Sequence, residues 1–107
     1  MINIGGLDWL AIQSNGWTAT FDLVQDANGN LRGSAKAGHP VEVAFSGTVD
    51  QSVSKVSGES VLIVVNWQSG SQGVYSGNLN LQRKLVGITF DEKHPTSQAT
   101  WFSSRSF

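Results

Sequence analysis

The chain has 107 residues, which is enough for one hydrophobic core and too short for two, so we expect a single domain spanning residues 1–107. Its net charge is −1 and only 14% of its residues are charged, so no basic surface is available for nucleic acid or an anionic membrane, and we expect neither partner. It contains no cysteine, which excludes disulfides, thiolate metal sites and cysteine nucleophiles. No signal-peptide pattern or transmembrane run is visible, and the compartment, cytoplasmic or mature secreted, stays undetermined.

Short stretches of alternating apolar and polar residues, separated by turn residues, predict β-strands throughout the chain. In chain order, we expect eight strands at residues 7–13, 17–23, 31–35, 41–49, 61–67, 74–81, 84–91 and 98–107. A tight hairpin turn is expected at 26–30, and a polar stretch at 51–59 separates the fourth and fifth strands. Because the connections are short, parallel crossovers are excluded, and the sequence predicts an all-β, antiparallel, up-and-down meander.

Four of these strands contain a large apolar residue followed two positions later by glycine. The pairs are Leu31 and Gly33, Phe45 and Gly47, Tyr75 and Gly77, and Leu85 and Gly87. Residues at positions i and i+2 of a strand share one face, so each pair places a bulky side chain beside a gap. Such gaps suit a tightly coiled sheet whose backbones approach closely, and we therefore expect a small closed barrel of eight strands.

Alternate connections of an up-and-down barrel lie at the same end. The connections at 14–16, 36–40, 68–72 and 91–97 therefore share one end, which collects both histidines and both prolines. Aromatic and neutral polar side chains near this end are typical of a ligand pocket, although aromatics at strand ends can equally fill a small barrel. The candidate ligand-binding residues are the aromatic Trp17, Trp67, Tyr75 and Trp101 and the polar Asn15, Gln68, Ser71 and Gln72.

Several segments resemble motifs of the avidin and streptavidin family. Residues 29–35 are similar to the family's Gly-x-Leu-x-Gly-x-Tyr motif, and residues 45–49 to its Leu-Thr-Gly-Arg-Tyr motif. Residues 64–67 followed by 73–78 resemble a strand that ends in a pocket tryptophan and the Trp-Ser-Gly or Trp-Thr-Gly strand after it. The resemblance spans about residues 9–107 and implies an avidin-like, eight-stranded barrel.

The biotin site implied by this resemblance is largely missing. Trp67 matches the family's pocket tryptophan, and Ser71 or Gly73 stands where hydroxyl groups contact biotin. Because buried polar groups without partners lower affinity, we expect no tight biotin binding. The departures are Ala35 in place of a pocket tyrosine, Phe90 or nothing in place of a second tryptophan, residues 105–107 without the family's aspartate, and Gln13 or Asn15 in place of an asparagine.

Catalytic and metal-binding motifs have little support. His39 and His94 share one barrel end and could meet over a metal or act with Asp91 in proton transfer, but each precedes a proline in a polar loop, where an exposed histidine is the default. Residues 26–30 begin like a calcium loop but lack its glycine and terminal glutamate, which favours a hairpin turn. We therefore expect no enzymatic activity, no metal and no cofactor.

Binding is the function that the sequence favours. We expect a non-enzymatic module that holds a small polar ligand at the barrel mouth, with tryptophan and tyrosine side chains as walls. The alternative is a carbohydrate-binding lectin, in which exposed tryptophan faces stack on sugars while the amides of Asn15, Gln68 and Gln72 form hydrogen bonds.

Self-association is expected from the fifth predicted strand. If Val61, Ile63, Val65 and Trp67 face the interior, the alternate residues must face outward. Monomers rarely leave such an apolar patch in water, and the avidin resemblance implies the same, so we expect a homodimer or homotetramer. A monomer with a few exposed aliphatic residues is the alternative. The expected interface residues are Leu62, Val64 and Val74, with Val86 and Ile88 extending the patch.

Overall fold

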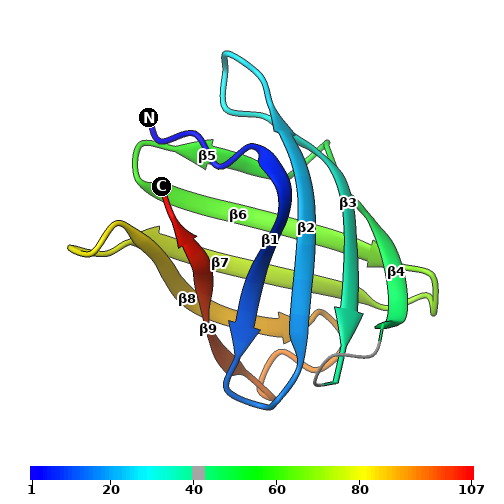
Figure 1. Ribbon diagram of the computed structural model, residues 1–107. Coiled ribbons are helices and arrows are strands. Elements are labelled where there is room, and N and C mark those ends of the chain that lie inside the picture. Colours follow the sequence, from blue (N-terminus) through cyan, green and yellow to red (C-terminus); the bar gives the residue numbers. More distant parts are fainter. Residues whose placement is uncertain (40–42) are drawn as a thin grey trace.

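A computed structural model describes residues 1–39 and 43–107, and the described residues form strands without a helix (Figure 1). All eight predicted strands are present with small shifts at their ends, and positions 41 and 42 of the predicted strand 41–49 lie outside the described residues. The strands are β1 (Gly6–Gln13), β2 (Thr18–Gln25), β3 (Leu31–Gly38), β4 (Val43–Val49), β5 (Lys55–Ser57), β6 (Ser60–Trp67), β7 (Gln72–Leu79), β8 (Lys84–Asp91) and β9 (Ala99–Ser106).

The eight long strands form a closed antiparallel up-and-down barrel, which confirms the predicted fold. Each long strand pairs with the next one along the chain, β9 returns to β1, and β4 pairs with β6. The additional strand β5 pairs with β6 on the edge that β4 also uses. The sequence did not predict β5, because three residues inside a polar stretch are too short for an alternating pattern to stand out.

The glycines of β3 and β8 lie where neighbouring backbones approach closely, as the sequence predicted. A side chain at Gly33 would collide with the carbonyl oxygen of Asp22 on β2. In the same way, a side chain at Gly87 would collide with the carbonyl oxygen of Ser76 on β7. Since these obstacles are main-chain atoms inside a hydrogen-bonded sheet, no rotamer change can remove them.

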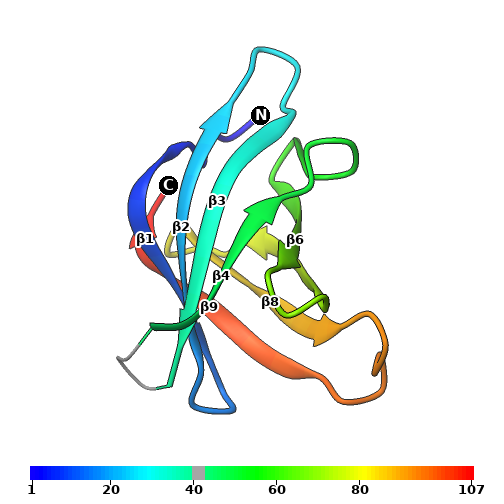
Figure 2. The ribbon, with the colours of Figure 1, turned by 90° about the vertical axis from the view of Figure 1, so that its right-hand side faces the viewer.

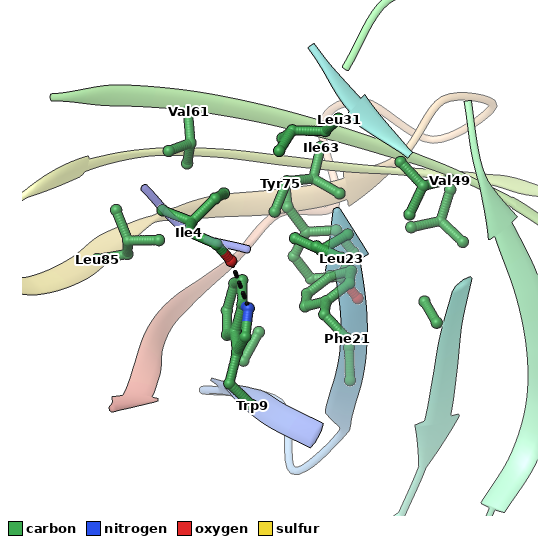
Figure 3. Packing of buried hydrophobic residues seen from close by; sticks show 14 of the residues in the cluster. Ile4, Trp9, Phe21, Leu23, Leu31, Val49, Val61, Ile63, Tyr75 and Leu85 are labelled. Carbon is green, nitrogen blue, oxygen red and sulfur yellow. Dashed lines mark hydrogen bonds between the residues drawn. The ribbon is translucent and has the colours of Figure 1, made fainter. Parts of the chain in front are cut away.

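Residues before β1 close one end of the barrel. Ile2 and Ile4 are buried in the core cluster. Figure 3 shows Ile4 among the other buried side chains, with its carbonyl oxygen hydrogen-bonded to Trp9. Trp9 Nε1 donates a hydrogen bond to the Ile4 carbonyl oxygen at 3.0 Å, while the Gln25 amide accepts from Ile4 N–H and donates to the Ile2 carbonyl oxygen, each at 2.9 Å. Phe107 packs against Trp9 with ring centroids 5.2 Å apart. The two termini thus meet at this closed end, opposite the β1–β2 hairpin (Figure 2).

Aromatic rings link the closed end to the middle of the barrel. The Phe21 ring lies 4.9 Å from the Trp9 ring and 5.2 Å from the Tyr75 ring, and Tyr75 lies 6.0 Å from Trp101. Such tilted and edge-on contacts between ring centroids are favourable aromatic geometries. The packed core therefore extends from the plug formed by the N-terminal residues up to Tyr75.

Candidate functional site

The end of the barrel opposite the termini contains a pocket of about 300 Å³. It lies at the predicted barrel mouth, and five of the eight candidate residues line it: Asn15, Trp17, Trp67, Ser71 and Tyr75. The other lining residues, none of them among the eight, are Gln13, Ala37, Phe45, Ser69, Gly73, Thr89, Phe90, Asp91 and Ser97.

Trp67 lies along the pocket wall between two glycines. A Cβ atom added at Gly47 on β4 would lie 2.8 Å from Trp67 Cε3, and one added at Gly73 on β7 would lie 2.7 Å from Trp67 Nε1. These two atoms are on opposite sides of the indole, and β4 and β7 are the strands on either side of β6. The ring therefore spreads across three strands, and the absence of side chains at both glycines lets it lie against the wall.

A second aromatic group stands at the rim of the pocket. Trp17, just before β2, stacks on Phe45 of β4 with ring centroids 5.6 Å apart and an angle of 28° between the planes. His39 meets the edge of Trp17 at a centroid distance of 5.4 Å but does not line the pocket. Phe45 is 41% exposed, so part of an aromatic ring at the mouth is open to solvent.

The floor of the pocket is polar. Gln13 Nε2 donates a hydrogen bond to the Tyr75 hydroxyl oxygen at 2.7 Å, and the side chain of Thr89 also bonds this hydroxyl. Burial raises the pKa of Tyr75 to about 12, and the hydrogen bonds with Thr89 and Gln13 offset only part of this rise. Tyr75 therefore remains a neutral phenol at physiological pH.

Titration of Tyr75 is directly measurable because it is the only tyrosine in the chain. Its folded pKa of about 12 lies above the ordinary value of 10.0, so the neutral phenol stabilises the fold fully below pH 10.0, and this contribution is lost as the pH rises to about 12. We expect the loss to be about 2–3 kcal/mol of unfolding free energy. Phenolate absorbance and urea unfolding across this interval measure both effects, with Tyr75→Phe as the control that removes them. A folded-state titration at the ordinary value would contradict the expectation.

Trp101 was predicted to bind the ligand, but it does not line the pocket, because it lies below the pocket in the barrel interior. It is 2% exposed, and its Nε1 donates to the carbonyl oxygens of Ile88 at 3.0 Å and Ser76 at 3.3 Å. Its ring occupies the space that a side chain at Gly77 would need, since an added Cβ would lie 2.9 Å from Trp101 Cζ2. For this tryptophan, the alternative interpretation as a core-filling residue is the one that the structure supports.

Gln68 and Gln72 also lie off the pocket. Trp67 and Gly73 face inward, so their neighbours in sequence point to the other face of the sheet. Gln68 is exposed in the turn after β6, and Gln72 Nε2 donates to Asn66 Oδ1 at 2.9 Å. The alternation of inward and outward side chains along β6 and β7 would have excluded both glutamines from the pocket. The same alternation along β1 and β8 would have identified Gln13, Thr89 and Asp91 as inward-facing residues near the mouth.

The remaining candidate motifs form no metal site. Within the described residues, no three His, Asp or Glu side chains come together as metal ligands, and His94 is exposed in the turn after β8. The Asp26 carboxylate accepts hydrogen bonds from the N–H groups of Asn28 and Asn30, each at 2.9 Å, which is the hairpin turn that the sequence predicted.

The described part of the chain has no helix long and apolar enough to cross a membrane.

Within the described residues, the pocket is therefore an uncharged floor of Gln13, Tyr75 and Thr89 beneath aromatic walls, with one carboxylate, Asp91, near the rim. Comparisons with protein-family models, with curated proteins and with solved structures found no match to this chain.

Proposed function

We propose that the chain is a non-enzymatic binding module that holds a small polar ligand in the pocket at the barrel mouth. The observation that carries the proposal is the contrast between the two barrel ends. Ile2 and Ile4 plug one end, whereas the other keeps about 300 Å³ open between aromatic walls and a polar floor. An eight-stranded barrel is just wide enough to be filled by side chains or to hold one small ligand, and this volume suits the second use.

The chemistry of the lining favours binding over catalysis. Tyr75 stays protonated because its pKa is raised, and neither His39 nor His94 lines the pocket. Asp91 is the only Asp, Glu, Lys, Arg or His residue in the described lining. Proton-transfer catalysis usually pairs an acid with a base near the reacting atoms, and the described lining provides no such pair.

Replacing Trp67 by alanine should abolish ligand binding, because it removes the wall that spans β4, β6 and β7. A thermal-shift screen of small polar molecules would supply the ligand, and calorimetry would measure its affinity for both proteins. The variant should lose about 3–5 kcal/mol of stability as well, so its fold must be verified by circular dichroism. Val61→Ala, which removes a buried side chain from the core cluster outside the pocket lining, should lower stability while leaving affinity unchanged.

A second variant tests whether ligand binding depends on the position of the indole as well as on its presence. Gly73→Ala keeps Trp67 but adds a methyl group only 2.7 Å from its Nε1, so the ring must shift from its place against the wall. We expect lower affinity with this variant too. Unchanged affinity in folded Trp67→Ala protein would show that the ligand binds elsewhere.

Carbohydrate binding has less support in this geometry. Of the three amides that a lectin would use, only Asn15 lines the pocket, and its Oδ1 already accepts a hydrogen bond from Trp17 N–H at 3.2 Å. Trp17 and Trp67 are half-buried within the pocket, whereas sugar stacking requires an accessible ring face. Binding on a glycan array that persists in Trp67→Ala protein would favour the lectin alternative.

The outer face of the barrel supports a second proposal, pairing with another copy of the chain. Val86, Ile88 and Phe102 are each more than a third exposed on β8 and β9, beside the half-buried Leu62 and Val74. The outward residues between them are Ser76, Asn78 and Thr100, which are uncharged. Lys84 Nζ lies 6.0 Å from the centroid of the Phe102 ring, so two copies would meet over the uncharged residues with this lysine beside them.

The Val64 side chain is less exposed on this outer face than the sequence predicted. It is only 6% exposed, because the turn after β4 lies along it: Asp50 N–H donates to the Val64 carbonyl oxygen at 2.7 Å, and Ser54 Oγ accepts from Val64 N–H at 2.9 Å. A lysine at this position would disturb the fold itself. Ile88 is therefore the better position at which to test the interface.

Light scattering at micromolar concentration should show a dimer or tetramer for the native chain and a monomer for Ile88→Lys. An introduced charge cannot be buried across the interface without a partner. Val24→Lys, at an exposed valine on β2, should leave the assembly intact. A native mass of 11.5 kDa would refute this proposal.

A further inference from the structure

The pocket has an asymmetric charge. Its described lining contains one acidic side chain, that of Asp91, and no lysine, arginine or histidine. An anionic ligand would therefore meet a like charge and no compensating cation. A cationic ligand would meet an opposite charge in a partly enclosed space, where electrostatic attraction is stronger than in bulk water.

Asp91 lies beside the indole of Trp67. Asp91 pairs directly with Gly73 across β7 and β8, so both residues project to the same face of the sheet. The space in front of Gly73 is occupied by Trp67 Nε1. Asp91 on β8 and the indole of Trp67 from β6 therefore both lie next to Gly73 on β7, at the point where β8 ends at the mouth.

The carboxylate retains binding capacity. Within the described residues its only hydrogen bond comes from Lys93 N–H, which donates to Oδ1 at 2.8 Å. This bond belongs to the turn after β8 and orients the side chain. The second carboxylate oxygen has no hydrogen-bond partner there, so it can accept from a ligand.

Aromatic rings surround the same space. Trp67 forms one wall and the stacked pair of Trp17 and Phe45 stands at the rim, above the neutral ring of Tyr75. The faces of such rings attract cations, tryptophan most strongly, and rings combined with a carboxylate are the usual recognition site for organic ammonium groups. A neutral polar ligand would leave the negative charge of the carboxylate uncompensated, and a metal ion would find only one charged ligand within the described lining.

We infer that this pocket takes an organic ammonium cation, with the charged nitrogen between Asp91 and the aromatic rings. The inference rests on the proposed function, because it names the class of ligand that the same pocket holds. The polar floor formed by Gln13, Tyr75 and Thr89 would then face the uncharged, polar end of the ligand.

Choline and its neutral carbon isostere, in which a tert-butyl group replaces the trimethylammonium group, form a matched pair of probes. Calorimetry and tryptophan fluorescence should show choline binding about tenfold more tightly than the isostere. Asp91→Asn should weaken choline binding about tenfold and leave the isostere unaffected. Glu92→Gln removes the same charge from the adjacent exposed residue, which does not line the pocket, and should change neither affinity.

The outcomes separate this inference from the proposed function. Equal affinity for the two probes, or choline binding that survives Asp91→Asn, would overturn cation recognition. If neutral compounds bind in a Trp67-dependent way and choline does not, the pocket function stands and the cation inference fails. If no probe of any charge distinguishes the native chain from Trp67→Ala, both fail.

Discussion

Replacing Gly87 by alanine is expected to destabilise the barrel by about 3 kcal/mol or more, enough to unfold a marginally stable domain. The added methyl group would collide with the Ser76 carbonyl oxygen and would lie 2.6 Å from Gly77 Cα. Gly87 pairs directly with Gly77, so two strand backbones pass here without side chains between them. The strands cannot separate locally, because they are bonded to their neighbours around a closed barrel.

Gly58→Ala is the matched control for Gly87→Ala. Gly58 lies in the turn between β5 and β6 with φ 61°, and a Cβ atom there would meet nothing within 4 Å. Its cost should be limited to the backbone preference of glycine at positive φ, about 1 kcal/mol. Urea unfolding of both variants measures the difference. Equal losses of stability would mean that close backbone approach at Gly87 is unimportant.

Replacing Ile4 by alanine is expected to lower the unfolding free energy by about 2–5 kcal/mol, although this residue precedes the first strand. Ile4 is fully buried, and its backbone is held by Trp9 and Gln25. Alanine would leave a cavity between the plug and the core, and the surrounding strands of a closed barrel cannot collapse to fill it. The effect is therefore that of a core residue and not that of a chain terminus.

Leu7→Ala tests whether burial is the cause. Leu7 is three residues further along the chain and equally apolar, but it is 77% exposed, so its replacement should cost less than about 0.5 kcal/mol. Hydrogen exchange provides an independent measurement, since Ile4 N–H should be protected by the Gln25 side chain in the native protein. Rapid exchange of this amide, or equal stability losses for the two variants, would show that the N-terminal residues do not plug the barrel.

The two barrel ends contribute differently to the stability of the protein and to ligand binding. The plug and the aromatic contacts from Trp9 to Tyr75 supply core burial at the closed end. The open end can then keep an unfilled space without losing the fold. Variants at the closed end should therefore change stability with little effect on ligand affinity, which is the basis of the Val61→Ala control.

The sequence by itself determined the eight long strands, their order and the faces of their side chains. Period-two alternation decides which residues face inward, and short connections allow only antiparallel neighbours. The glycine positions were also predictable, because a bulky residue followed two places later by glycine marks a gap on the inner face. Gly33 and Gly87 lie at such gaps, with a neighbouring backbone filling each.

Only the tertiary structure decided how deep each inward residue lies. Trp67 and Trp101 both face inward over glycines, yet one lines the pocket and the other fills the core, because strand register sets their position along the barrel. Register also places Asp91 opposite Gly73 and thus beside Trp67. The plug at Ile4 depends on contacts with residues far along the chain, and no local pattern records them. The alternation of apolar and polar residues specifies which face of the sheet a side chain occupies. The position of that side chain along the barrel axis depends on the stagger of all eight strands together.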